Sequence, residues 1–388
     1  MFKINNRLCL LLLLTLCCWS IESGAQGMYL SVKQFGAKGD GTTDDTEAIM
    51  KAIKASQDAI ISTNNIKGVY ELQGNSIYVG GSKAVFFPLG MYKISKPVVV
   101  GSYTHLIGEK AILIPSDKNL SVGILSSSWQ GHFEGLQFVG FKTAIKIDNK
   151  NLDCGKIQIE DCDFVSNGTA IELNAVSSLC TIKENRFFRN DKALDVIGGD
   201  KVIMTDNWIT AGTLKGKQDC QITNRGVLHF ERNMLVPIPP AAGAVEPAWI
   251  NNYGNLLIDG VRQGGELGSF TLVNNFTQAS TNYPIWPNVV SIRNSDCYAV
   301  YGNSAAYTQP AALRLIGIPN SIVLEDLRGF VDAKVMDFSQ TSLNESTARL
   351  RGVTTNLFSI RVSNIHGARM KFSNGTDVPD NLKQYEIK

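Results

Sequence analysis

Alternating apolar and polar residues recur at regular steps through the middle of the chain. Ile157–Phe164 and Cys180–Phe187 each have two apolar residues spaced by two, then polar residues and a further apolar residue. Such alternation is typical of a strand with one buried face. The second apolar position recurs at Phe133, Ile159, Ile182, Met204, Phe230, Ile258, Ile292 and Leu324. The steps of 26, 23, 22, 26, 28, 34 and 32 residues predict a β-solenoid with one coil per repeat and insertions at its turns.

A second strand precedes this one in several coils. The segments are Ala144–Asp148, Ala170–Asn174 and Ala193–Ile197. Each coil is therefore predicted to hold at least two strands. Little helix signal follows residue 60, and the leucine and asparagine frame of a leucine-rich repeat is absent.

Equivalent positions just after a strand predict a ladder of stacked side chains. These positions are Cys162, Asn185, Asn207 and Asn233. Amides stacked in successive coils can hydrogen-bond along a solenoid, so we assign them a structural role.

The start of the solenoid has a candidate cap. Thr46–Ser56 has apolar residues at helical spacing, and Asp44 and Asp45 precede it, where carboxylates favour a helix N-terminus. We expect this helix to cover the first coil, because an open coil exposes strand edges and core.

Three segments near the N-terminus resemble a known family. Val32–Ile49, which contains Gly-Ala-Lys-Gly-Asp-Gly-Thr-Thr-Asp-Asp, resembles the opening of pectate-lyase-superfamily β-helix proteins such as polygalacturonases and phage tailspikes, and Ala84–Ile94 and Leu106–Glu109 resemble their first coils. The resemblance implies an all-β fold, a single-stranded right-handed parallel β-helix with a short N-terminal capping helix. It says little about activity, because unrelated activities share the motif. For the same reason we interpret Asp40, Asp44 and Asp45 as turn and cap residues.

The resemblance to polygalacturonases ends in the first coils. The Asn-Thr-Asp, Asp-Asp, Gly-His-Gly and Arg-Ile-Lys motifs of that subfamily are missing, and Ile365–Gly367 and Arg369–Lys371 are only a faint echo near the C-terminus. Pectin hydrolysis by that set of residues is therefore not expected.

The first residues are typical of an export signal. Lys3 and Arg7 precede an apolar run over residues 8–19, and Ser23-Gly24-Ala25 fits a signal-peptidase site. We predict cleavage after Ala25, a secreted or periplasmic location, and one β-helix domain over residues 26–388. The alternative is a lipoprotein acylated at Cys17 or Cys18, although Leu16 and Cys17 fit poorly before such a cysteine. No other stretch predicts a membrane span.

Charge and cysteine content exclude some classes of function. Without Lys3, Arg7 and Glu22, 35 basic and 34 acidic residues remain, a net charge of +1, which argues against a nucleic-acid partner. Five cysteines remain and none forms a CxxC pair, so no zinc site or other metal site is predicted. We interpret the closely spaced Cys154, Cys162 and Cys180 as small buried residues rather than as disulfide partners.

Outward positions of the earlier strand in each coil predict a polar stripe. Alternation places Lys146, Asp148, Glu172, Asn174 and Asp195 outward, and a looser alignment continues the stripe through Gln221, Thr223, Trp249, Asn251 and Arg314. An extended sugar chain suits such a surface, because its hydroxyls meet polar groups and its ring faces stack on Trp. We predict that Lys146, Trp249, Asn251 and Arg314 contact substrate.

Two long segments interrupt the coil pattern beside this stripe. They are Pro237–Tyr253 and Arg262–Pro287, and the second contains Arg262, Glu266 and Trp286. Long loops in a compact fold often carry function. We therefore place the substrate cleft between them, with Trp286 as a further substrate contact. A glycine-rich turn with a surface ion pair is the structural alternative.

The leading hypothesis is an enzyme that cleaves a polysaccharide outside the cytoplasm. Hydrolysis needs two carboxylates, for which Glu172, Asp195 and Glu266 are candidates. Elimination needs a base and a group that neutralises a uronate, for which Arg262, His229 and Arg314 are candidates. No cofactor is predicted, except Ca²⁺ in the case of a lyase. The alternative is a non-catalytic glycan-binding β-helix, such as an adhesin. The substrate and the oligomeric state stay open.

Overall fold

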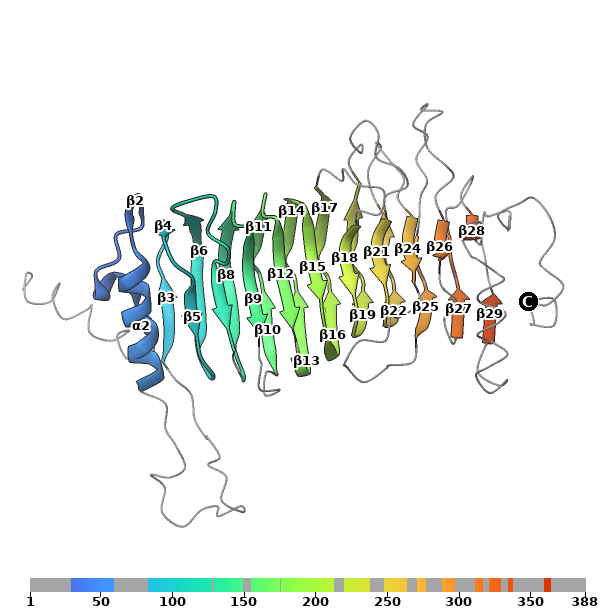
Figure 1. The fold of residues 1–388 in the computed structure, drawn as a ribbon, viewed down its shortest axis with the longest axis horizontal. Helices are drawn as coiled ribbons and strands as arrows, with labels where there is room; N and C mark the ends of the chain where they lie inside the picture. The colour runs from blue at the N-terminus through green and yellow to red at the C-terminus, as the bar shows by residue number, and fades with distance from the viewer. Residues whose placement is uncertain are drawn as a thin grey trace, which may run out of the picture.

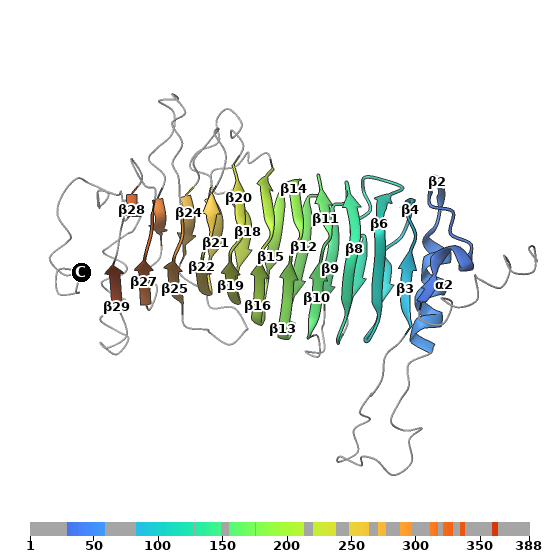
Figure 2. The same ribbon diagram turned by 180° about the vertical axis from the view of Figure 1, so that it is seen from behind.

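The described strands form coils stacked along one long axis (Figures 1 and 2). The computed structural model describes residues 29–58, 83–127, 129–148, 155–174, 176–212, 220–237, 248–263, 271–276, 288–296, 311–316, 321–328, 334–337 and 359–363. Its strands pair in parallel with those of the next coil, in two sheets. The larger sheet consists of two ladders that share the long strands β6 and β8, so a full coil contributes a strand to each of three ladders. The prediction of a parallel β-helix is confirmed.

Ladder 1 is the sheet in which most of the predicted stripe lies. Its strands are β5 Val98–Val100, β7 Ile124–Ser126, β9 Thr143–Asp148, β12 Thr169–Asn174, β15 Lys192–Val196, β18 Cys220–Asn224, β21 Ala248–Asn252, β24 Thr271–Asn275, β26 Ala311–Leu315 and β28 Lys334–Asp337.

Ladders 2 and 3 make up the larger sheet. Ladder 2 contains β1 Tyr29–Ser31, β3 Ala84–Phe87, β6 His105–Pro115, β8 His132–Val139, β10 Ile157–Glu160, β13 Val176–Lys183, β16 Gly199–Thr205, β19 Val227–Glu231, β22 Asn255–Asp259, β25 Val289–Arg293, β27 Ser321–Glu325 and β29 Ser359–Ser363. Ladder 3 contains β2 Asp40–Asp44, β4 Met91–Ile94, β6, β8, β11 Asp163–Val165, β14 Arg186–Asn190, β17 Trp208–Ala211, β20 Met234–Val236 and β23 Arg262–Gln263.

Inward residues stack in columns and form the core. Phe138, Phe164 and Phe187 lie in register on ladder 3, fully buried, with ring centroids 5.2 and 5.0 Å apart. Ile159 and Ile182 likewise lie in register on ladder 2 and are fully buried. The period-2 pattern of the sequence thus sets which face of each strand is buried.

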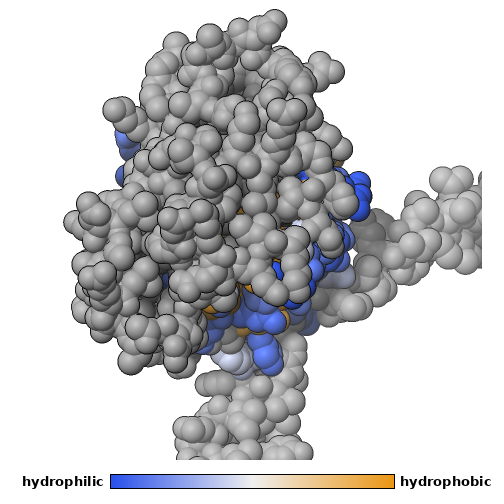
Figure 3. Space-filling view, turned by 90° about the vertical axis from the view of Figure 1, so that its right-hand side faces the viewer, coloured by the Kyte–Doolittle hydropathy of each residue, from blue (hydrophilic) through white to orange (hydrophobic). Residues whose placement is uncertain are grey.

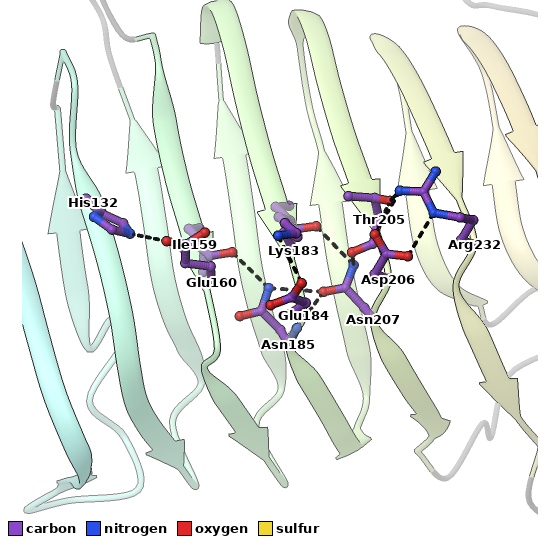
Figure 4. A network of polar contacts seen from close by, with 11 residues as sticks. His132, Ile159, Glu160, Lys183, Glu184, Asn185, Thr205, Asp206, Asn207 and Arg232 are labelled. Carbon is purple, nitrogen blue, oxygen red and sulfur yellow. Dashed lines mark hydrogen bonds and ion pairs between the residues drawn. The ribbon is translucent and has the colours of Figure 1, made fainter.

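The corner between ladders 2 and 3 combines a left-handed residue with an asparagine ladder. Non-glycine residues with φ between 48° and 56° occupy this corner at Lys110, Asp161, Glu184, Asp206, Arg232, Asn294 and Asp326. Just after it, Asn185 Oδ1 accepts from the Cys162 amide at 2.9 Å. In the next coil, Asn207 Oδ1 accepts from the Asn185 amide at 2.9 Å (Figure 4). The predicted ladder is confirmed. It supplies acceptors to backbone groups that the tight corner would leave unpaired.

The N-terminal motif builds a cap. Helix α2 (Thr46–Asp58) covers the first coil and buries Ile49, Ala52 and Ile53 (Figure 1). The short 3₁₀ helix η1 (Val32–Phe35) precedes it and contacts it. Asp44 accepts from the Thr46 amide at the helix start, as predicted.

The remaining motif residues also have structural roles. Asp45 is buried and accepts from the Lys38 and Gly39 amides at 2.6 and 3.0 Å, and Asp40 accepts from the amides of Thr42 and Thr43. Gly39 has φ +63° and packs so closely on Tyr92 that a Cβ would lie 2.9 Å from the ring. The interpretation of the motif as turn and cap residues fits these contacts.

Two predicted insertions prove to contain regular strands. Pro237–Tyr253 includes β21, and Arg262–Pro287 includes β23 and β24. The apolar–polar alternation does not reveal these strands, because Asn252 and Asn275 occupy inward positions at which earlier coils have Leu or Val. Cys162, Cys180 and Cys220 are buried free thiols, as expected for small core residues. Cys154 lies outside the described residues.

Candidate functional site

A single register line on ladder 1 carries the predicted stripe. The outward residues Lys146, Glu172, Asp195, Thr223, Asn251, Asn274 and Arg314 pair in order from β9 to β26. We call this line the polar row. Registered neighbours in parallel strands lie about 4.8 Å apart, so the row is a continuous track along the long axis.

The first half of the row is charged and partly open to solvent. Lys146 Nζ lies 2.8 Å from Glu172 Oε1. Asp195 Oδ2 lies 3.2 Å from Lys192 Nζ, and its Oδ1 accepts from Arg225 Nη1 at 3.0 Å. Side chains of Lys146, Glu172 and Asp195 are 20–26% exposed. The hydrogen bond with Glu172 is the main cause that raises the pKa of Lys146.

An aromatic pair adjoins the charged half. Arg225 lies over the ring of Tyr253 at 5.4 Å, and Tyr253 stacks on Phe276 with centroids 4.7 Å apart. Both aromatic residues follow directly after ladder 1 strands, where the Tyr253 and Phe276 amides bind carbonyls of the preceding coil. Burial raises the pKa of the Tyr253 hydroxyl. The Tyr253 ring thus holds the Arg225 guanidinium in the position from which it donates to Asp195.

The second half of the row is buried, contrary to expectation. Asn251 and Arg314 are 6% and 2% exposed, and they form a chain of contacts in which Arg314 Nη1 donates to Asn274 Oδ1 and Asn274 Nδ2 donates to Asn251 Oδ1. Alternation predicts the side of a strand on which a residue lies, but not whether other atoms cover that side. The predicted open surface therefore extends only to Asp195.

Trp249 is the clearest correction. It lies on the same side of β21 as Asn251 but is fully buried. Its neighbours in the adjoining coils, Gln221 and Leu272, are buried as well. An indole enclosed in this column has no open face for a sugar ring to stack on.

A second asparagine ladder lies directly behind the row. Asn224 Nδ2 donates to Asn252 Oδ1, and Asn252 Nδ2 donates to Asn275 Oδ1, each at 2.8 Å. All three are fully buried and in register. A satisfied network of this kind holds neighbouring coils in one register, so it fixes the spacing of the row above it.

Other predicted residues lie elsewhere. His229 lies on β19 in ladder 2, with Nδ1 3.7 Å from Glu231, and burial lowers its pKa. Arg262 lies on β23 in ladder 3. Neither is on the ladder that carries Glu172 and Asp195, so the predicted catalytic residues do not form one site. Glu266 and Trp286 lie outside the described residues.

A histidine-carboxylate cluster on ladder 2 went unrecognised in the sequence. His132 Nε2 lies 2.8 Å from Glu160 and 3.8 Å from Glu134 (Figure 4). Ligand atoms of the three residues lie within 4.8 Å of one another, so among the described residues this group has the donors to hold a metal ion. His105 packs edge-on against His132, and burial, followed by the charge of His132, lowers its pKa. The signal was the spacing of His132 and Glu134 by two residues.

Sequence comparison matches the first coils to a known family. The family described as rhamnogalacturonase A/epimerase, pectate lyase-like, matches residues 29–116, the segment that holds the cap, the motif and the first strands. The first coils of the chain are thus similar to pectate-lyase-like proteins, and the described chain has the parallel β-helix fold. A solved structure of the same fold is the DFA-IIIase of Arthrobacter chlorophenolicus, with 12% identity, a TM-score of 0.50 and coverage of 91% of this chain and 100% of that one.

Curated relatives of this β-helix protein match over short segments. A probable glucan endo-1,3-beta-glucosidase of Arthroderma benhamiae is 37% identical over 82 residues, which is 21% of this chain and 8% of the relative. The plasmin and fibronectin-binding protein A of Streptococcus pneumoniae is 35% identical over 86 residues, 22% of this chain and 9% of the relative. The matches thus span less than a tenth of either relative.

In the end-on view of Figure 3, the described residues that can be seen are mostly hydrophilic. Among described residues, no helix combines the length and apolar character needed to cross a bilayer.

Proposed function

We propose that this protein is a polysaccharide-cleaving enzyme whose substrate lies along the charged half of the polar row. The observation that carries the proposal is the register of Glu172 with Asp195 on adjacent strands. Two carboxylates one coil apart on an accessible face provide the minimum set for glycosidic hydrolysis. The name of the glucosidase relative and the family of the first coils support a carbohydrate substrate.

The spacing favours hydrolysis with retention of configuration. Retaining enzymes hold their two carboxyl groups about 5–5.5 Å apart, and one coil advances about 4.8 Å. Asp195 receives Lys192 on one oxygen and Arg225 on the other, which suits a fixed nucleophile. Glu172 is bound by Lys146 through Oε1, so it would take up a proton from water on its other oxygen and then pass that proton to the leaving group.

The substrate is an extended chain outside the cytoplasm. The row runs along the long axis, so successive sugars would meet successive coils, and Arg225, which lies over the Tyr253 ring, would border them. Export after cleavage at Ala25 is part of this proposal, with acylation at Cys17 or Cys18 as the alternative. Hydrolysis by two carboxylates requires no cofactor, whereas the lyase alternative would involve Ca²⁺.

A binding function without cleavage is the second candidate. The ion pairs of Glu172 with Lys146 and of Asp195 with Arg225 favour it, because the same contacts would also stiffen a face that binds a ligand without cleaving it. The streptococcal relative is named for binding plasmin and fibronectin rather than for catalysis.

A panel of polysaccharides separates these functions. The purified protein is incubated with each polymer, with and without a chelator, and reducing ends and unsaturated uronate are measured. New reducing ends without unsaturation support hydrolysis. Both products together, with loss on chelation, would replace it by elimination. Binding on a glycan array without any product would replace it by the binding function.

A further inference from the structure

A groove on ladder 3 is lined by three arginines. Arg232, Arg262 and Arg328 surround a space of about 490 Å³ together with Asp296 and Met234. Its other lining residues are Asn233, Gly260 and Asn294. Ligand-binding clefts typically have volumes of about 300–1,000 Å³. We call this space the arginine groove.

Successive coils supply its wall in register. The backbone of Met234 pairs with that of Arg262 on the next strand. Isolated parallel β-bridges then join the backbones of Arg262 and Asp296, and those of Asp296 and Arg328. Parallel strands place such neighbours about 4.8 Å apart. The groove is therefore elongated along the solenoid axis, as an extended ligand requires.

Its charges are not balanced by its own acidic residue. Arg232 is held by Asp206 through two hydrogen bonds of 2.9 and 2.8 Å and by Thr205 (Figure 4). Arg262 and Arg328 are exposed and, within the described part of the chain, have no ion-pair partner. Asp296 is the one acidic residue among those that line the groove, so Arg262 and Arg328 leave it with positive charge for an anion.

An exposed aromatic platform continues the groove. Trp208 precedes Met234 in the same register line and is 52% exposed. Its Nε1 donates to Thr210 on the same strand, which orients the indole. On the preceding strand, Phe188 is 36% exposed under the Arg189 guanidinium. The Trp208 indole is thus open to a ligand that lies along the groove.

We propose that the arginine groove and Trp208 form a binding surface for an acidic polysaccharide. Guanidinium groups bind carboxylates or sulfates in a fork geometry, and an indole stacks on the ring faces between those groups. Free inorganic anions lack the ring that Trp208 would contact, and a neutral glycan lacks the charge. The surface lies on ladder 3 rather than ladder 1, so the inference does not rest on the proposed cleavage at the polar row.

Binding to chemically matched polymers tests the proposal. Polygalacturonate, its fully methyl-esterified form and chondroitin sulfate are titrated with the whole protein by calorimetry. Proteins compared are the wild type, Arg262→Gln/Arg328→Gln, Trp208→Ala and the control Arg361→Gln, which changes an exposed, ion-paired arginine of ladder 2. Equal thermal midpoints establish that the variants are folded.

The expected result has three parts. One or both acidic polymers bind, and the esterified polymer binds at least roughly tenfold more weakly. The double variant and Trp208→Ala each lose affinity by a similar factor, whereas Arg361→Gln does not. Added salt weakens the binding.

Three results would overturn the proposal. The first is equal affinity of the double variant and the wild type for acidic polymer. The second is equal affinity of the wild type for the acidic and the esterified polymer. The third is competition by single-stranded DNA as strong as by the polysaccharide, because it would show a site for any polyanion. Loss of cleavage at the polar row would leave these binding results unchanged.

Discussion

Glu172 on β12 lies in direct register with Asp195 on β15, and each carboxylate contacts a basic side chain. Lys146 reaches Glu172 from the preceding coil. Arg225 reaches Asp195 from the turn directly after β18, the ladder 1 strand of the next coil. Because the partners come from different coils, the pair depends on the stacking of four strands, β9 to β18. A local segment of sequence could not build it.

Replacing Tyr253 is expected to slow the chemical step more than it weakens substrate binding. Tyr253 supports Arg225, which donates to Asp195, but touches neither carboxylate in any described contact. Tyr253→Ala should lower kcat by roughly fivefold or more with a small change in KM. Tyr253→Phe keeps the ring and should behave like the wild type. An equal fall of kcat in both variants would argue that the hydroxyl takes part in the reaction.

The coil architecture could be predicted because inward positions obey simple alternation. Ile159 and Ile182 mark adjacent coils by spacing alone, and they lie in register. The same argument failed at β21 and β24, where asparagines occupy inward positions. The steps from Asn224 to Asn252 to Asn275, which are 28 and 23 residues, match the coil length. The spacing of these asparagines thus indicates the second ladder in the sequence, but a pattern based on apolar inward residues does not detect polar residues in the core.

The candidate site was only partly predictable. The outward sides of Lys146, Glu172 and Asp195 follow from alternation, and the structure places them in one line. The burial of Trp249 and Arg314 depends on contacts between coils, which no local pattern encodes. The same holds for the arginine groove, because Arg232, Arg262 and Arg328 come from three separate turns and strands.

Extending the first asparagine ladder by one rung should stabilise the protein. Cys162 stands at the end of that ladder, its sulfur facing the Phe133 carbonyl at 3.6 Å and the Leu136 amide. These are the partners that an asparagine amide needs. Cys162→Asn should therefore raise the free energy of unfolding by about 0.5–1.5 kcal/mol, measured by urea denaturation.

A control variant places the same side chain where no ladder exists. Ile182 is fully buried in the apolar column of the next coil. Ile182→Asn should lower the free energy of unfolding by more than about 2 kcal/mol, because it replaces an apolar side chain with an amide in an apolar environment. Equal destabilisation by both substitutions would contradict the assignment of the ladder.

Acid should weaken the N-terminal cap through Asp44. Partial burial alone would raise the pKa of Asp44, but hydrogen bonds from Ser95 and Thr46 outweigh it and lower the pKa below its ordinary value. A carboxylate with a depressed pKa stabilises the fold above its unfolded pKa of about 3.9 and loses this effect as the pH falls further. The thermal midpoints of wild type and Asp44→Asn should therefore differ at pH 6, and the difference should shrink as the pH falls below about 3.9.

Removing one donor provides the matched comparison for Asp44. Ser95→Ala deletes one hydrogen bond to this carboxylate and should show the same convergence with a smaller gap at pH 6. A gap between wild type and Asp44→Asn that stays constant or widens in acid would contradict the role assigned to the carboxylate.

The rate at which Asp195→Asn releases reducing ends from the best polysaccharide of the panel tests the proposed function most directly. Asp163→Asn is the matched control, because Asp163 also pairs with an arginine, at 2.9 Å, but lies on ladder 3. Cleavage at the polar row predicts that Asp195→Asn is folded and at least ~10²-fold slower than the wild type, while Asp163→Asn keeps the wild-type rate. A folded Asp195→Asn variant with the wild-type rate would contradict it.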